Sequence, residues 1–186
     1  MARGIDERLN ALIEMKARLL NMTPVMRSIG EMVIAEAQQS FVTETSPDGS
    51  AWPALSPVTI ARRHDSGKRE RLGRGVLGPR RLVGRVYAGR AYGIKMLRDN
   101  GRLFGGLSAT PQPKSLKFGA DVVYGRALHE GNPKNKMFKK WSAPIPARRF
   151  FPVAGRDGPM RTGRGGAMWV RAYEMIMRYL QTGRVD

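Results

Sequence analysis

The sequence predicts an α+β fold: N-terminal helices, a small antiparallel sheet with a long basic loop or hairpin arm, and a C-terminal helix. Apolar residues recur at helical spacing near both ends of the chain, and short strand patterns occur only between them. The chain does not show the regular alternation of strands and helices that is typical of a parallel sheet. We expect residues 1–186 to form a single domain.

Two helices are expected at the start of the chain. Apolar residues recur at i, i+4, i+7 and i+8 from Ile5, which predicts an amphipathic helix over about residues 4–20. A second helix is predicted from Thr23-Pro24, a capping residue followed by proline at the first helical position, to Phe41. Only Asn21 and Met22 separate the two helices, so they are expected to form a hairpin or a sharp elbow.

Residues 46–63 combine a turn, an aromatic ring and a helix start. Pro47-Asp48-Gly49 predicts a tight turn, because proline presets φ, aspartate bonds its own backbone and glycine accepts a positive φ. Trp52 is expected to be buried, with a partner for its N–H. Ser56-Pro57 predicts a short capped helix that ends near His64. The three features together predict a fixed corner.

A strongly basic segment follows this corner. Residues 62–102 contain 13 Lys or Arg against three acidic residues, and glycines occur throughout. Such a segment does not easily form a core of its own, so we expect residues 67–93 to project as a basic arm, with local strands near 82–87 and 92–97. Its arginines suit bidentate pairing with phosphate or carboxylate. They are Arg69, Arg71, Arg74, Arg80, Arg81, Arg85 and Arg90.

The second half of the chain gives weaker patterns. Asp99-Asn100-Gly101 is either a hairpin turn or the cap of a short helix that extends to Leu107. Residues 115–120 alternate polar and apolar side chains, which predicts a half-buried strand, and residues 125–131 predict a short helix stopped by glycine. Residues 144–152 are expected to be extended because their prolines disfavour helix in the preceding residues.

A glycine-rich linker over residues 155–166 is expected to lead to the last helix, over about residues 166–181. Within this linker, Gly163-Arg164-Gly165-Gly166 is interpreted as a flexible joint rather than an anion-binding nest. One face of the last helix is expected to carry Trp169, Ala172, Tyr173, Ile176, Tyr179 and Leu180.

The composition favours an anionic partner over catalysis. The net charge is +18, and there are no cysteines for a disulfide or a thiolate metal site. No apolar run is long enough to span a bilayer and no export signal is present, so no membrane association is expected. His129-Glu130 is the one pair that suggests metal or acid–base chemistry, but it lacks the spacing of a zinc-binding helix. We expect no enzyme activity and no cofactor.

Four segments carry a resemblance to a known family. They are PDGSAWPALSPVTIARR (47–63, the first motif), KMLRDNGRLFGGL (95–107, the second), YGRALHEG (124–131, the third) and IPARRFF (145–151, the fourth). In this order and spacing they resemble the phage virion morphogenesis family, the tail-completion proteins of Mu-like and related tailed phages. The residues that match the family's pattern are Asp48, Gly49, Trp52, Leu55, Thr59, Gly101, Leu103, Tyr124, His129, Pro146, Ala147, Arg148 and Phe150.

The resemblance implies a structural virion protein that acts in tail completion, where the tail joins the head at the neck. It implies self-association into a ring, for which we expect a hexamer, and contacts with neighbouring head–tail connector and tail proteins. The basic arm is expected to reach these neighbours or the DNA in the channel. The protein is expected in the virion, and in the host cytoplasm during assembly. The alternative is a sequence-independent nucleic-acid-binding protein, which the net charge of +18 favours.

Overall fold

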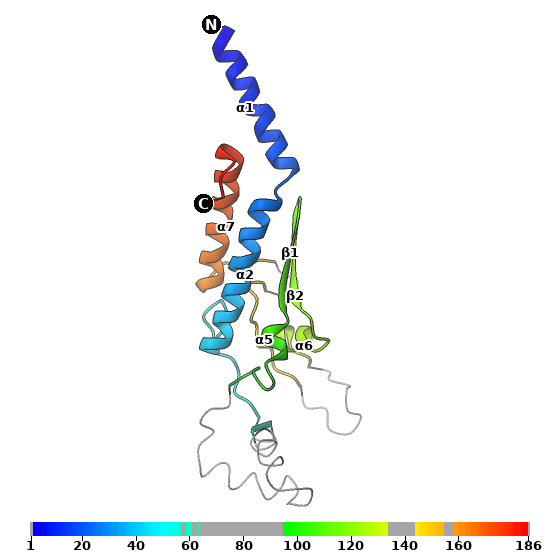
Figure 1. Ribbon diagram of the computed structural model, residues 1–186. Coiled ribbons are helices and arrows are strands. Elements are labelled where there is room, and N and C mark those ends of the chain that lie inside the picture. Colours follow the sequence, from blue (N-terminus) through cyan, green and yellow to red (C-terminus); the bar gives the residue numbers. More distant parts are fainter. Residues whose placement is uncertain are drawn as a thin grey trace, which may run out of the picture.

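The computed structural model describes residues 2–56, 59–60, 63, 95–133, 144–154 and 158–185. Its elements are α1 (Ala2–Leu20), α2 (Thr23–Thr43), α5 (Arg102–Gly105), β1 (Leu107–Gln112), β2 (Ser115–Ala120), α6 (Gly125–Glu130) and α7 (Gly163–Thr182). Helix α2 lies between α7 and the β1–β2 hairpin, and α1 extends beyond all three (Figure 1). The α+β class is therefore confirmed. The basic arm lies outside the described residues.

Helix α2 forms the centre of the core. Val25, Ile29, Val33, Ala37 and Phe41 follow one another in steps of four, and each is at most 2% exposed. Because a step of four slightly exceeds one helical turn, this row winds slowly around α2. It thereby reaches both neighbours of α2, the hairpin on one side and α7 on the other.

The start of α2 differs in detail from the expectation. The helix begins at Thr23 as predicted, but Thr23 provides no side-chain cap. Asn21 instead accepts the backbone N–H of Thr23 through its Oδ1 at 3.3 Å. The amide side chain of the two-residue break thus satisfies one of the free N–H groups of the first helical turn.

The β1–β2 hairpin is the only paired sheet among the described residues. Its strands are antiparallel, with Leu107 opposite Ala120 and Gln112 opposite Ser115. The strand predicted at residues 115–120 is confirmed, whereas β1 was not expected, since Leu107 had been assigned to a helix. The strand expected near 92–97 is wrong for its described part, because residues 95–97 form a turn in which Leu97 has a φ of 56°.

Gly30 allows the hairpin to lie close against α2. A Cβ atom at this position would be 3.1 Å from the Cβ of Ala109 on β1 and 3.2 Å from a methyl carbon of Leu116 on β2. The tip of the hairpin is held as well, because the backbone N–H of Met22 donates to the Pro113 carbonyl at 3.0 Å. Helix and hairpin therefore pack with little space between their backbones.

Helix α7 begins earlier than expected and packs directly on the predicted turn. It begins at Gly163 rather than near residue 166, so the flexible joint predicted for residues 163–166 is wrong. Gly163 has a φ of 64°, and a Cβ there would be 2.5 Å from the carbonyl carbon of Asp48. The N–H of Gly165 donates to the Pro47 carbonyl at 2.9 Å. The glycines are thus required for close packing.

An arginine joins α7 to α2. Arg164 donates to Glu36 Oε1 at 2.9 Å and, more weakly, to the hydroxyls of Ser40 at 3.3 Å and Thr43 at 3.2 Å. Further along α7, Ala172 and Tyr179 are buried as expected, together with Met168. Tyr173 was expected on the same face, but it is 64% exposed, because it lies to the side of the arc that contains Met168, Ala172 and Tyr179.

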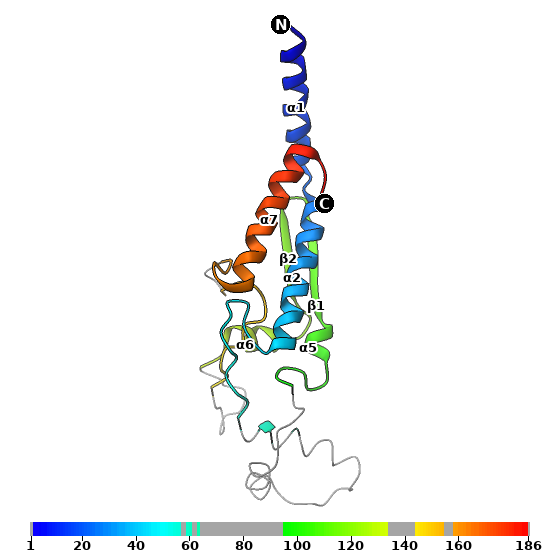
Figure 2. The ribbon, with the colours of Figure 1, turned by 90° about the vertical axis from the view of Figure 1, so that its left-hand side faces the viewer.

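Helix α1 leaves the body of the protein. It continues beyond the N-terminal end of α2 and does not fold back beside it, so the hairpin alternative is wrong (Figure 2). The base of α1 is fixed by Arg18, which donates to the carbonyls of Leu180 at 3.1 Å and Gln181 at 2.9 Å. These carbonyls belong to the last turn of α7, where a positive charge is favourable.

We expect Gly163→Ala to lower the free energy of unfolding by about 3 kcal/mol or more, because it combines a left-handed backbone with a clash against Asp48. Gly101→Ala is the matched control, since Gly101 has a φ of 75° but a Cβ added there would meet no atom within 4 Å. It should cost only about 1 kcal/mol. Urea denaturation measures both. Equal losses would contradict the proposed close contact.

Candidate functional site at the junction of the four motifs

The four motifs meet at one end of the body, around the C-terminal end of α2. We call this place the junction. It contains the turn after α2, the segment around α5, the short helix α6 and the extended residues 144–154, which lie together below the hairpin in Figure 1. Segments up to 97 residues apart in the sequence are joined there by hydrogen bonds.

The turn of the first motif has the predicted geometry. Gly49 has a φ of 97°, and its N–H donates to the Ser46 carbonyl at 2.9 Å. Asp48 Oδ1 accepts the backbone N–H of Ser50 at 2.8 Å and the Ser50 hydroxyl at 2.6 Å. Burial alone would raise the pKa of Asp48, but these hydrogen bonds outweigh burial and lower it. The Asp48 carboxylate therefore stabilises the turn through its hydrogen bonds to Ser50.

The first and fourth motifs are joined by two buried side chains. The Trp52 indole N–H donates to the Arg149 carbonyl at 2.8 Å, as expected for a buried tryptophan. Arg148, only 5% exposed, donates to the carbonyls of Pro53 at 2.9 Å and Ala54 at 3.0 Å. Burial, and secondarily the charge of Arg63, lowers the pKa of the Arg148 guanidinium. Arg148 thus binds backbone carbonyls and is turned inward.

The third motif supports the fourth from the other side. His129 Nδ1 accepts the backbone N–H of Phe150 at 3.2 Å, and the Leu128 carbonyl accepts the N–H of Arg148 at 2.8 Å. Gly131 has a φ of 78°, and a Cβ there would lie 2.9 Å from the backbone nitrogen of Ala147. Only glycine therefore permits this approach of the two motifs.

His129 is held as a neutral side chain. It is 7% exposed, and its ring lies edge-on to Phe150 with the centroids 5.0 Å apart. Because Nδ1 accepts a hydrogen bond, the proton is assigned to Nε2, which is buried and has no partner at hydrogen-bonding distance among the described residues. Burial lowers the pKa of His129, and the nearby Val153 backbone opposes that lowering only in part.

The second motif closes the junction. Its Leu97 and Leu103 are buried, and the Met96 N–H donates to Glu44 Oε1 at 2.8 Å. Asn100 Oδ1 accepts the N–H of Arg102 at 3.1 Å at the start of α5, so the helix alternative for this segment is confirmed and the hairpin alternative is wrong. The α5 helix is nevertheless shorter than expected, because it ends at Gly105.

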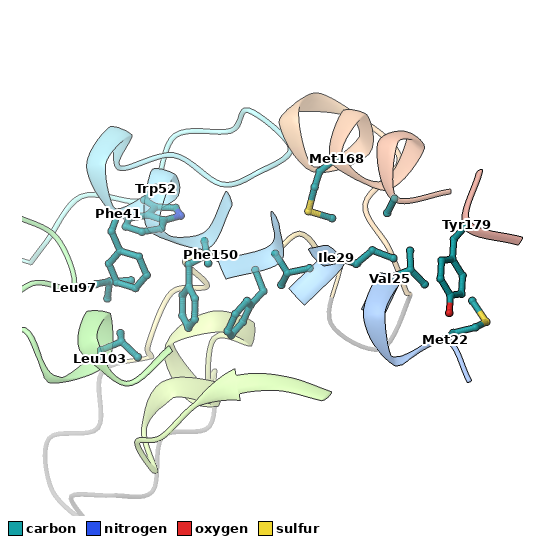
Figure 3. Packing of buried hydrophobic residues seen from close by; sticks show 14 residues of the cluster. Met22, Val25, Ile29, Phe41, Trp52, Leu97, Leu103, Phe150, Met168 and Tyr179 are labelled. Carbon is teal, nitrogen blue, oxygen red and sulfur yellow. The ribbon is translucent and has the colours of Figure 1, made fainter. Parts of the chain in front are cut away.

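Aromatic rings fill the space between the motifs (Figure 3). Phe41 contacts Trp52, Phe104 and Phe150, with ring centroids 5.2 to 5.6 Å apart. Phe150 in turn contacts Phe151 at 5.0 Å. Phe41, Phe104 and Phe151 were not among the motif residues singled out from the sequence. Their apolar character was the only available signal, since residues far apart in the chain supply these contacts.

The matched residues do not all enter the junction core. Trp52, Leu103, His129, Arg148 and Phe150 are buried there. Leu55 and Thr59 are half-buried, whereas Gly49, Gly101, Tyr124, Pro146 and Ala147 are exposed. Ser56 Oγ accepts the N–H of Thr59 at 3.3 Å, the cap predicted for the short helix, whose end lies outside the described residues. The arginines of the basic arm also lie outside them.

The side chains that meet at the junction hold segments of the chain together, and His129 and Glu130 are not directed at a common point. His129 is directed at Phe150, while Glu130 pairs with Arg126 at 3.1 Å on the outer side of α6. Within the described residues, no group of three or more metal-ligating side chains occurs. The same part of the chain contains no helix long and apolar enough to cross a membrane. Fold and junction together define an α+β protein in which buried polar side chains hold motifs from distant parts of the chain together.

The family comparison agrees with this class. The model of the Phage virion morphogenesis family matches residues 2–74, which include α1, α2 and the whole first motif. Over this part the resemblance is confirmed: residues 2–74 are similar to the Phage virion morphogenesis family, whose members are structural phage proteins without enzyme activity. The other three motifs lie beyond the match. No match was found among curated proteins or among solved structures.

Trp52→Phe and Arg148→Met are expected to be coupled, because both remove donors that join residues 52–54 to residues 148–149. Each should lower the free energy of unfolding by about 1–3 kcal/mol. The double variant should lose less than the sum, by about 0.5 kcal/mol or more. Arg18→Met, at the base of α1, is the control that should add with Trp52→Phe. Additivity in both pairs would contradict the shared junction.

His129 should make the stability depend on pH. Its pKa is lowered in the folded state, so the unfolded chain takes up a proton first as the pH falls below the ordinary value of 6.5. The free energy of unfolding should then decrease by up to about 1.4 kcal/mol per pH unit. His129→Asn keeps an acceptor for the Phe150 N–H but does not titrate, and it should remove this decrease. His64, the second histidine, stays in both proteins as a control.

Proposed function

We propose that the protein completes the tail and joins it to the head at the phage neck, and that it acts there as a homo-oligomeric ring, for which a hexamer is our working stoichiometry. The match of residues 2–74 to the Phage virion morphogenesis family carries this proposal. The ordered motifs beyond residue 74 support it through their resemblance to tail-completion proteins. In this role the chain binds its own copies and the neighbouring connector and tail proteins.

The junction supports the proposal as a rigid base for the basic arm. Arg63 and Lys95 stand just outside residues 67–93, and Arg63 Nη1 donates to the Lys95 carbonyl at 2.9 Å. Arg63 also pairs with Asp99 at 3.6 Å. The described residues that flank the arm are thus tied to each other and, through the second motif, to the aromatic core. Force or binding on the arm would be transmitted to a part of the protein that resists deformation.

The charge of the arm defines its partner. Its seven named arginines present planar donor groups suited to carboxylate or phosphate. We therefore propose acidic surfaces of the neighbouring neck proteins as its principal contact during assembly in the host cytoplasm. The DNA that passes through the channel is the further contact we propose for the arm.

A second candidate function is sequence-independent nucleic-acid binding, which the net charge of +18 favours. The two functions differ in what the arm must contact. A variant with all seven arm arginines changed to glutamine removes both charge and forked donors, whereas a variant with seven lysines keeps the charge. Both leave the described body unchanged in sequence.

Deleting the gene from its phage should leave DNA-filled heads and separate tails, as seen by electron microscopy and by mixing extracts that supply heads or tails. The wild-type chain should restore joining, and the seven-glutamine variant should not. Normal virions from the deletion would contradict the neck function. Partial rescue by the seven-lysine variant would assign part of the effect to charge alone.

The salt dependence of DNA binding tests the second candidate. If every arm arginine contacts a phosphate of duplex DNA, the slope of log K against log salt should become shallower by about 6 in the seven-glutamine variant. The seven-lysine variant should keep most of the wild-type slope. A wild-type protein whose affinity does not change with salt would exclude phosphate contacts, and head–tail joining would then depend on protein contacts alone.

A further inference from the structure

Helix α1 carries an apolar surface that nothing in the described chain covers. Six side chains on one side of the helix are 52–68% exposed, and we call them the α1 stripe: Ile5, Leu9, Leu12, Ile13, Leu19 and Leu20. At about 100 Å² each, they expose about 600 Å² of apolar surface, as much as the largest patch on a typical monomer. This is most of the roughly 800 Å² that each partner buries in a standard interface.

The position of α1 makes this surface available to another molecule. Above its base, which contacts the end of α7, the helix stands clear of the hairpin, α2 and α7 in both views (Figures 1 and 2). Its stripe extends about 22 Å from Ile5 to Leu20. The base is held to α7 by Arg18, so the helix starts from a fixed point. An isolated helix of this length is marginal in water, so contact with a partner would stabilise it.

The same chain presents a second uncovered apolar surface on α7. Val170, Tyr173 and Met177 are spaced at i, i+3 and i+7, and they are 60%, 64% and 39% exposed. We call them the α7 stripe. Each copy therefore has one projecting helix and one receiving face on different parts of its surface. Two different surfaces that bind each other produce head-to-tail contacts, which close into a ring when the rotation allows.

Charge also favours a second copy as the partner. Residues 5–20 contain three acidic and three basic residues, so α1 is neutral over this range in a chain whose net charge is +18. Copies therefore repel each other least at this helix. Lys16 lies within the α1 stripe, and Glu174, the only acidic residue of α7, lies beside the α7 stripe. The two charges are complementary and would set the register of the contact.

We infer that the α1 stripe of one copy packs on the α7 stripe of the next copy, with Lys16 facing Glu174, and that this contact links the copies head to tail. The inference rests on the proposed ring, whose interface it identifies. The inferred contact uses α1 and α7, whereas the proposed binding of acidic neighbours uses the basic arm, so the two proposals concern separate parts of the sequence.

Cysteine pairing tests the contact directly, because the chain has no cysteine of its own. Chains with Leu12→Cys, mixed with chains with Tyr173→Cys, should form mixed disulfide dimers in excess of either like pair. A chain that carries both changes should give a ladder of covalent multimers under oxidation. Pairing of Leu12→Cys mainly with itself would mean that α1 packs on α1. A ladder that stops at the dimer would mean reciprocal exchange. Either outcome overturns the inference.

Mass measurement of the purified protein gives an independent result. Leu12→Asp should weaken self-association by about thirtyfold or more, whereas Ala11→Asp, an exposed position off the stripe, should leave it unchanged. Lys16→Glu and Glu174→Lys should each weaken self-association, and the two together should restore it. A wild-type chain that stays monomeric when concentrated overturns the inference, as does a Leu12→Asp ring of normal mass.

The gene deletion separates this inference from the proposed function. If the deletion blocks head–tail joining but Leu12→Asp assembles normally, the function holds and the interface is wrong. If Leu12→Asp disrupts the ring but the deleted phage still makes normal virions, the interface holds and the neck function is wrong. Thermal unfolding at a concentration too low for self-association serves as the folding control, and there Leu12→Asp should match the wild type, because Leu12 is 62% exposed.

Discussion

The junction depends on the hydrogen bonds that the backbone N–H and C=O groups of the fourth motif make with the other motifs. Apart from an isolated antiparallel bridge between Ile145 and Asn132, residues 145–151 pair with no strand, so the β1–β2 sheet does not supply partners for their peptide groups. The other motifs supply them: Leu128 accepts the N–H of Arg148, Trp52 donates to the Arg149 carbonyl, and His129 accepts the N–H of Phe150. Three consecutive residues are thus held by two different motifs. A buried segment without these bonds would lose much of its stability.

Local chemistry made part of this structure predictable. The turn at Asp48 and the glycine stop after α6 depend on residues within a few positions, and the burial of Trp52 follows from the size of its apolar ring; all three were expected from the sequence. Strand β1 was missed because the alternation in LSATPQ covers only four residues and is followed by a proline, which disfavours a strand, whereas pairing with β2 completes it. Gly163 was misread for a related reason. Its conformational freedom suggested a flexible joint, whereas the contact with Asp48, 115 positions earlier, requires its missing side chain.

At the candidate site, too, contacts between distant residues could not be predicted from the sequence. The sequence identified His129 and Arg148 but not what they bind. A buried histidine that holds the backbone has the same sequence neighbours as a catalytic histidine beside a glutamate, and a buried arginine has the same ones as an exposed arginine. Burial decides both cases: Arg148 is turned inward and donates to backbone carbonyls of the first motif, and His129 is turned inward and accepts a backbone N–H of the fourth motif through Nδ1. Tyr173 is the reverse case. Helical spacing placed it with the buried face of α7, but the neighbours of α7 cover a narrower arc than the apolar residues occupy.

The exposed apolar residues of α1 and α7 favour association of copies, whereas the positive net charge of the chain opposes it. Copies with a net charge of +18 repel one another, and the repulsion weakens only where charges are balanced or neutralised. The helix α1 is balanced by its own acidic residues, whereas the basic arm can be neutralised only by a partner. Self-association through α1 could therefore proceed before any acidic neighbour is present, and arm binding would then strengthen it by reducing the repulsion between copies. For the proposed ring, this distribution of charge predicts an order of assembly in which copies associate first and neighbours bind second.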